Sequence, residues 1–401
     1  MLKYLSLAAA FISLFSAAAY DLYLFPTVAD NVYDQVRYVM PERGIFIPTL
    51  SRVECGQVFH LHIAVGIKEP LTEPLKLKGA IQVKNPDGSV KIVVPETVMI
   101  ELPSGAKGIY FAGKDVSGEF EKKDRFGVYE WTLTVKDASG GVKSASAKLN
   151  LAESISDNAP MDRTEFNKFI MNYYRQPQPE RIMAALRYFM TEGDAEMRSR
   201  QKNYDPRHVL QAFVELFKLN KQFHDDLARA TSGAAEPHRL YYALIFAGLG
   251  KDAVMAQKEV IDPQVQVQIG QFAGKDPLAF KKVVLPAHLD MLWAEFFITG
   301  RFAPVQKIVD QLHDRKGINV KDAQKKVKSG AKLTADEQRE VMEHMIQIAA
   351  AWSLGSNLKK SQLLGYYIET VLRRKLYKSN DVAVNLAGII KQVKSTLRSK
   401  K

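Results

Sequence analysis

The chain has 401 residues, of which 46% are hydrophobic and 25% are charged, and its formal net charge at pH 7 is +12. This composition is ordinary for a globular protein and excludes disorder as the default state of most of the chain. The length allows two domains, each with its own core. The positive charge favours anionic partners such as acidic proteins or polyanionic polymers, although solubility is a simpler explanation for it.

The first nineteen residues differ from the rest. Lys3 gives a positive start, residues 5–15 form a short apolar run, and three alanines (17–19) precede Tyr20. This pattern predicts a secretory signal peptide over residues 1–19; a retained membrane anchor is the alternative. No later segment has enough consecutive apolar residues to cross a membrane. We therefore expect an exported protein, periplasmic or extracellular, for which nucleic acid is a poor partner.

Cys55 is the only cysteine in the sequence. An intramolecular disulfide is therefore excluded, and core packing has to hold each domain together. The alternatives for this thiol are a buried or inert side chain and a reactive group. No local feature argues for reactivity, so we expect the first.

Residues 20–152 show the period of two that is typical of β-strands. Residues 127–136 and 142–151 alternate apolar and polar side chains around a turn that contains Gly140 and Gly141, which predicts a β-hairpin. Further short strands are expected at residues 59–65, 77–84, 90–94, 98–102 and 109–111. Strands at this spacing predict an antiparallel β-sandwich.

The motif Asp124-x-x-Gly127-x-Tyr129-x-Trp131 starts the predicted hairpin. It resembles the tyrosine corner of immunoglobulin-like β-sandwiches. The resemblance implies that the Tyr129 hydroxyl bonds back to the backbone a few residues upstream. It implies a fold but no activity, because such sandwiches have many functions.

His60 and His62 stand two apart on one predicted strand, so both rings point to the same face. Two imidazoles in this position are able to start a metal site. No acidic or histidine partner follows at short range, and we therefore predict a solvated strand face. The sequence predicts no metal site and no cofactor.

Residues 153–160 are polar and lack periodicity, which predicts a linker. Residues 161–401 then keep the 3.6-residue period of helices. Several segments begin with an acidic residue followed by proline, and Thr334 with Glu337 forms a capping box. The helix after this box carries a predicted apolar stripe of Val341, Met345, Ile348, Ala349 and Trp352.

Residues 286–314 predict a helical hairpin. Its first helix has one broad apolar face, Gly300 ends that helix where a left-handed residue is needed, and Pro304 falls in the first turn of the second helix. Gly300-Arg301-Phe302 resembles the turn of a degenerate tetratricopeptide (TPR) unit. Residues 292–312 and 349–357 are also similar to stretches of uncharacterised exported bacterial helical proteins. These resemblances imply a curved helical scaffold, and we predict an α-solenoid of stacked helical hairpins.

Motifs of hydrolases, metalloproteases and phosphate-binding loops are absent from the sequence. The closest arrangement to an acid–base site combines His288, Asp290 and Glu295 with Glu343 and His344. We predict that His288 is a hydrogen-bonded core or boundary residue, and we assign no catalytic residue.

Three tyrosine pairs lie within the predicted helices, at residues 173–174, 241–242 and 366–367. One member of each pair is expected to pack inside the protein. For the other member the alternatives are packing between helices with the hydroxyl at the rim and a place on a concave surface that binds peptide or sugar.

The basic segment 315–333 and the tail 391–401 are each expected to be solvated, or together to form a docking patch for an anion. The leading prediction is a non-enzymatic binding or scaffold protein of the bacterial cell envelope, with a protein or polyanionic partner on the helical-repeat surface. The alternatives are a hydrolase of envelope polymers, with acid–base residues on the helical domain, and a carbohydrate-binding β-sandwich.

Overall fold

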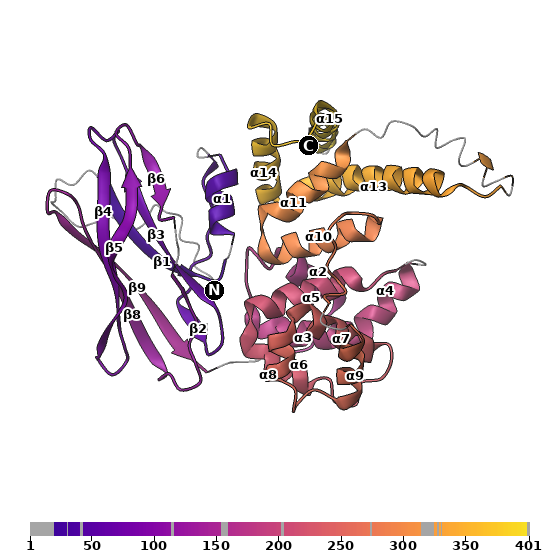
Figure 1. Ribbon diagram of the computed structural model, residues 1–401, viewed down its shortest axis with the longest axis horizontal. Coiled ribbons are helices and arrows are strands. Elements are labelled where there is room, and N and C mark those ends of the chain that lie inside the picture. The colour runs from indigo at the N-terminus through magenta and orange to yellow at the C-terminus, as the bar shows by residue number, and fades with distance from the viewer. Residues whose placement is uncertain are drawn as a thin grey trace. The chain divides into compact units, whose positions relative to one another are not determined.

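The computed structural model describes residues 20–29, 31–40, 43–113, 116–153, 159–201, 204–272, 275–313, 325–326, 329 and 331–398 (Figure 1). The predicted signal peptide, most of the linker and most of the basic segment 315–333 lie outside these residues, as does the end of the basic tail. A β-strand region is followed by a helical region. The chain divides into a unit of Met1–Pro26, Leu61–Val116 and Arg125–Asn150, and a unit of Thr27–His60, Ser117–Asp124 and Leu151–Lys401.

The first unit, here called the β unit, is built from two sheets. In one sheet the strand order is β1 (Tyr20–Thr27), β3 (Phe59–Ile67), β6 (Gly108–Phe111), and β7 (Val116–Gly118) also pairs with β3. In the other, β9 (Val142–Ala152), β8 (Gly127–Lys136), β4 (Leu75–Lys84) and β5 (Val90–Leu102) are successive neighbours. β4 is antiparallel to both β5 and β8. The short strand β2 (Arg52–Glu54) falls within the residues of the second unit.

The two strands predicted at residues 90–94 and 98–102 form the single strand β5. Pro95 lies inside it, at a shift of register that separates the pairs Gly79↔Thr97 and Ile81↔Val94. β5 stands at one end of its strand order. A proline at a register shift in such a strand interrupts the ladder least, which explains why the strand continues through it.

The hydroxyl of Tyr129 donates a hydrogen bond to the carbonyl oxygen of Arg125 at 2.9 Å. Gly127, between them, has a φ of +135°, which a residue with a side chain rarely adopts. Trp131 follows on the same strand face and is 6% exposed. The backbone contact that the tyrosine-corner resemblance implies is therefore confirmed, while the immunoglobulin-like topology stays a prediction.

The second unit, here called the helical unit, contains one helix that the sequence did not suggest, α1 (Val32–Tyr38). The other α-helices among the described residues of this unit are α2 (Arg163–Asn172), α3 (Ile182–Tyr188), α4 (Asp194–Arg200), α5 (Arg207–Leu219), α6 (His224–Arg229), α7 (His238–Leu249), α8 (Lys251–Ala256), α9 (Pro263–Gln271), α10 (Pro286–Thr299), α11 (Phe302–Val309), α13 (Ala335–Leu358), α14 (Gln362–Arg373) and α15 (Asn380–Arg398). The predicted capping box at Thr334 and Glu337 is present at the start of α13. Some consecutive helices, such as α10 and α11, pack on each other, but a TPR solenoid stays a prediction.

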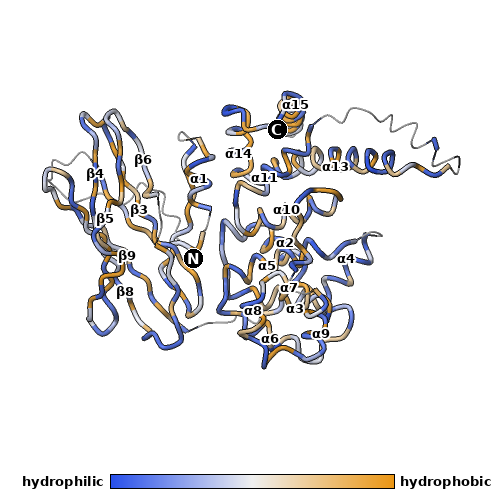
Figure 2. Tube along the Cα trace, viewed as in Figure 1, coloured by the Kyte–Doolittle hydropathy of each residue, from blue (hydrophilic) through white to orange (hydrophobic). Residues whose placement is uncertain are grey.

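Two hydrophobic clusters form the core of the helical unit, and α10 contributes to both. Met291, Ala294 and Ile298 belong to the cluster that includes α2, α5 and α7. Leu292 and Phe296 belong to the cluster that includes α11, α13 and α14. The prediction of one broad apolar face on this helix is therefore too narrow, because α10 is buried on more than one side. Figure 2 shows hydrophobic residues along it.

Gly300 joins α10 to α11 in the predicted left-handed conformation, with a φ of +66°. A Cβ atom at this position would lie 2.1 Å from Nδ2 of Asn31 and 3.0 Å from Cδ2 of Tyr174. The hydroxyl of Tyr367 donates to the Gly300 carbonyl at 2.9 Å. The backbone N–H of Phe302, at the start of α11, donates to a carboxylate oxygen of Asp34 at 2.7 Å. Segments from four parts of the sequence therefore meet at this turn.

We predict that Gly300→Ala lowers the free energy of unfolding by at least about 2 kcal/mol, because it adds left-handed strain and a steric clash together. The measurement is urea unfolding followed by circular dichroism. Gly270→Ala is the matched control, since Gly270 lies in α9 with no atom within 4 Å of the added Cβ. A loss of stability in the control as large as that in Gly300→Ala would contradict this explanation.

Candidate functional site

His62 is buried, with 2% of its surface exposed, and its ring lies 5.8 Å from that of Phe25 between centroids. His60 is half-buried, and its Nδ1 lies 3.0 Å from the Ser117 hydroxyl. The predicted solvated face is therefore wrong for His62, because the residues at the centre of β3 are buried on both faces of the sheet. Within the described residues, no three histidine, cysteine or acidic side chains gather as metal ligands would.

Cys55 is half-buried, and its thiol lies 3.5 Å from the Glu121 carbonyl oxygen. Burial raises the pKa of this thiol, and the carboxylate of Asp124 raises it further. A raised pKa keeps the thiol protonated and weakly nucleophilic. This agrees with the expectation of an inert side chain.

His288 is 8% exposed and stacks on the ring of Phe280, with the ring centroids 4.3 Å apart. Its Nδ1 accepts a hydrogen bond from the backbone N–H of Val284 at 3.3 Å. Burial lowers the pKa of His288, so the neutral imidazole is favoured. The prediction of a hydrogen-bonded core or boundary histidine is confirmed.

The carboxylates of Asp290 and Glu295 have charged neighbours on α5 or just before it, and Glu295 has further ones at α11. Burial raises the pKa of Asp290, Asp205 raises it further, and His208 opposes the shift. Burial also raises the pKa of Glu295, with Glu215 as the next cause. The sequence prediction did not include these α5 partners, although residues 208, 211, 215 and 218 show the spacing of a polar helical stripe.

The acid–base arrangement suggested by the sequence is not assembled within α10. His288 and Glu295 are two turns apart on this helix, about 10 Å along the helix axis. This separation is too long for direct proton transfer between them. Glu343 and His344 are half-buried on α13.

Both members of the first two tyrosine pairs are buried, which agrees with packing between helices and not with a place on a concave surface. Tyr173 and Tyr174 are 2% and 8% exposed, and Tyr241 and Tyr242 are 2% and 7% exposed. The hydroxyls of three of them find partners inside the protein. Those of Tyr173, Tyr174 and Tyr241 bond to Asn220, Ser361 and Asp194 respectively. The third pair follows the expectation: Tyr367 is buried and Tyr366 is half-buried.

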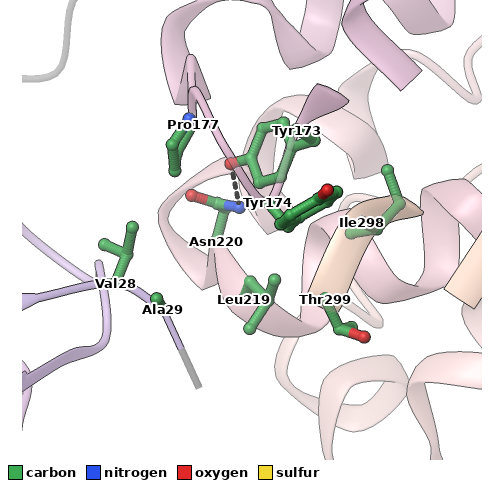
Figure 3. Close-up of a pocket in the computed structure, with 9 residues that line it drawn as sticks. All are labelled: Val28, Ala29, Tyr173, Tyr174, Pro177, Leu219, Asn220, Ile298 and Thr299. Carbon is green, nitrogen blue, oxygen red and sulfur yellow. Dashed lines mark hydrogen bonds between the residues drawn. The ribbon is translucent and has the colours of Figure 1, made fainter. Parts of the chain in front are cut away.

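A small cavity lies beside the first tyrosine pair (Figure 3). Its volume is about 10 Å³, which is room for one water molecule. The side-chain amide of Asn220 donates to the Tyr173 hydroxyl at 2.8 Å in its wall. The cavity is too small for a substrate. Its lining residues are Val28, Ala29, Tyr173, Tyr174, Pro177, Leu219, Asn220, Ile298 and Thr299.

The outward face of α13 is the most distinctive surface feature of the helical unit. Met345, Ile348 and Trp352 are 50%, 56% and 75% exposed. They follow one another at spacings of three and four residues, so they form one stripe along the helix, here called the outer seam. The apolar stripe predicted on this helix therefore faces solvent at these three residues. The buried residues of α13 are Ile346, Ala350, Ser353, Leu354 and Asn357.

The outer seam has no exposed polar side chain within it. Between residues 341 and 358, all of which the structure describes, Met345, Ile348 and Trp352 are the three exposed side chains. Figure 2 shows the resulting alternation of hydrophobic and hydrophilic residues along α13. Single exposed apolar residues are common on protein surfaces, but several on one helix face mark a binding site or an aggregation-prone surface.

The two ends of α13 differ in burial and in charge. Residues 335–345 are all exposed or half-buried, and these turns extend beyond the neighbouring helices (Figure 1). They contain Asp336, Glu337, Glu340 and Glu343 with a single arginine. The C-terminal end packs beside α15: a Cβ on Gly355 would lie 3.6 Å from Ile389. The next charged residues after Glu343, apart from a histidine, are Lys359 and Lys360.

Strand β5 also exposes apolar side chains, with Val90 and Ile92 60% and 59% exposed. It differs from the outer seam because exposed Lys91, Pro95 and Glu96 interrupt it. Charged residues and proline in an edge strand are features that discourage pairing with another strand. We therefore take the outer seam of α13 as the candidate functional site.

Comparisons with known proteins do not place the chain in a family. No protein-family model matches it, and no curated protein matches it. Similar solved structures include a superoxide reductase (neelaredoxin) from Ignicoccus hospitalis, at 10% identity over 25% of this chain and 75% of that chain, with a TM-score of 0.18. The soluble domain of PmoD from Methylocystis sp. is 17% identical over 35% of this chain and 95% of that chain, with a TM-score of 0.17.

The α2-macroglobulin of E. coli is 10% identical over 94% of this chain, which spans 25% of that protein, with a TM-score of 0.22. TM-scores this low assign neither a fold nor a function.

Among the described residues, no helix has the length and apolar character needed to cross a membrane.

We predict that Glu295→Gln stabilises the protein at pH 7. The raised pKa of Glu295 means that the folded state binds this proton more tightly than the unfolded chain, whose carboxyl titrates near 4.5. Stability is therefore lost as the pH rises from that value through the folded pKa. The melting temperature of the variant should exceed that of the wild type at pH 7, and the difference should vanish at pH 4. Glu96→Gln, on exposed β5, is the control, and an equal gain there would contradict the explanation.

Proposed function

We propose that this chain is an exported, non-enzymatic binding or scaffold protein of the bacterial cell envelope, and that it binds a protein partner through the outer seam of α13. The observation that carries the proposal is the stripe of Met345, Ile348 and Trp352 on the solvent side of a helix whose other side is in the core. Apolar anchors at i, i+3 and i+7 are how one helix is recognised by another helix or by a groove.

The energy of such a contact is dominated by Trp352. Three-quarters of its surface is exposed, and burying that area stabilises a complex by roughly 2–4 kcal/mol. Tryptophan is also enriched among the few residues that carry most of the binding energy in interfaces. Met345 adds a flexible, polarizable side chain that adapts to the shape of a partner.

The outer seam favours a protein over a polyanion. No charged side chain is exposed between residues 341 and 358, so the seam offers nothing to a phosphate or a carboxylate. A polyanion would instead need basic residues such as Lys391 and Lys394 on α15. The enzyme alternative has little support, because His288 is stacked on Phe280 and is only 8% exposed.

The export part of the proposal is supported by the sequence of residues 1–19 alone. We predict that the mature protein, purified from its native envelope, begins at Tyr20. Intact-mass spectrometry and N-terminal peptide mapping measure this directly. A mature N-terminus at Met1 would defeat the prediction of cleavage.

We predict that residues 20–401, used as bait in envelope extract, retain a stoichiometric protein at high salt, because a packed apolar contact is not weakened by charge screening. Trp352→Glu should reduce the retained amount at least tenfold. Val267→Glu is the matched control, since Val267 is 67% exposed on α9, away from the seam. Retention of an anionic polymer that salt releases, with no dependence on Trp352, would count against the seam and for the basic residues.

A further inference from the structure

The outer seam has the residue spacing of a coiled-coil stripe. Val341 precedes Met345, Ile348 and Trp352, and Gly355 follows, so that steps of four and three residues alternate along α13. This alternation keeps one stripe facing a second helix over several turns. We infer that the occupant of the seam is the same seam on a second copy of this chain, with the two α13 helices antiparallel. The inference rests on the proposed function, because it names the protein partner of that site.

An antiparallel pair matches large residues with smaller ones. With the twofold axis between residues 346 and 347, Met345 lies against Ile348 of the second copy, and Val341 lies against Trp352 of the second copy. The symmetry repeats each of these layers, which gives four successive apolar layers. Each copy thereby covers the three side chains that the other leaves in water.

The charges of α13 also select the antiparallel direction. Asp336, Glu337 and Glu340 lie near its start, whereas Lys359 and Lys360 follow its end. An antiparallel pair brings the acidic start of each helix beside the lysines of the other copy. A parallel pair would place acidic residues against acidic residues and lysines against lysines, which is unfavourable.

The structure leaves the seam accessible from Val341 to Trp352. Residues 335–345 are exposed or half-buried, so a second helix is able to approach Val341 and Met345. At the other end, Ile389 of α15 lies beside Gly355 and limits the seam there. An interface of about four turns is smaller than the roughly 1,200 Å² of a standard interface, so we expect a reversible dimer with a Kd of roughly micromolar size.

The first test is sedimentation of residues 20–401 between about 0.1 and 100 μM, a range that brackets the Kd expected from an interface of this size. The wild type and Val267→Glu should shift from monomer to dimer, and Trp352→Glu should stay monomeric.

Acrylamide quenching is an independent measurement of dimer formation. Trp131 and Trp293 are only 6% and 4% exposed, so Trp352 dominates the emission that acrylamide is able to quench. Quenching should decrease as the dimer forms.

The second test determines the direction of pairing by cysteine cross-linking in a Cys55→Ser background. Gln338→Cys and Ser356→Cys are made in separate proteins. In the antiparallel pair each new cysteine is about 25 Å or more from its own equivalent along the axis, whereas residue 338 of one copy lies beside residue 356 of the other. A disulfide dimer should therefore form in the mixture of the two proteins and not in either alone. Cross-linking of each alone would overturn the antiparallel arrangement.

The outcomes separate this inference from the proposed function. A chain that is monomeric at all concentrations, but retains an envelope protein in a Trp352-dependent way, overturns self-pairing and leaves the binding function in place. If the chain is monomeric and phosphatidylglycerol vesicles protect Trp352 from acrylamide, the seam binds a lipid surface. This result overturns both self-pairing and the binding of a protein partner. A dimer that Trp352→Glu leaves intact overturns the use of the seam.

Discussion

The helical unit depends on the burial of α10 on more than one side. Most helices of a globular protein have one apolar stripe and one wet face, but α10 supplies Met291 to one hydrophobic cluster and Leu292 and Phe296 to the other. Both clusters therefore depend on the same helix. The chain has to reverse tightly after α10, and only glycine suits this position, because Gly300 has a left-handed backbone and no room for a side chain.

The same burial explains why the acidic groups on α10 do not form a catalytic centre. Glu295 faces α5, where Glu215 is only 6% exposed and accepts hydrogen bonds from Gln211 and Lys218 at 3.1 Å each. These three polar groups of α5 satisfy one another along the helix that Glu295 faces, as buried polar groups generally must. The raised pKa of Glu295 is thus a consequence of packing. In this case a perturbed carboxyl does not indicate a substrate site.

Local signals in the sequence predicted the parts of the fold that depend on a few neighbouring residues. The capping box at Thr334, the left-handed Gly300 and the hydrogen bond of Tyr129 are of this kind, because each needs only a short motif. Helix α1 was missed because its seven residues are held by distant contacts, such as the stacking of Tyr38 on Phe302 at 3.9 Å. The burial of both Tyr173 and Tyr174 could not be predicted either, because their partners Asn220 and Ser361 come from other helices.

The candidate site illustrates a different limit, because α13 carries two apolar stripes and the sequence cannot say which one is buried. Met345, Ile348 and Trp352 form one stripe, and Ile346 and Leu354 lie with Ala350 on the other side, so hydrophobicity alone does not decide which side is buried. Packing decides: Ile346, Ala350 and Leu354 belong to the second cluster, and the small Ala350 lets α13 lie close to it.

Turning the helix would force Trp352 into a space shaped for alanine, at the cost that overpacking brings. It would also move Gly355 away from Ile389, which lies close enough to meet any added side chain. The stripe with Trp352 therefore faces solvent, because the space beside Ala350 is too small for an indole ring. Keeping this stripe in water costs free energy, and for that reason the proposed contact is placed on α13.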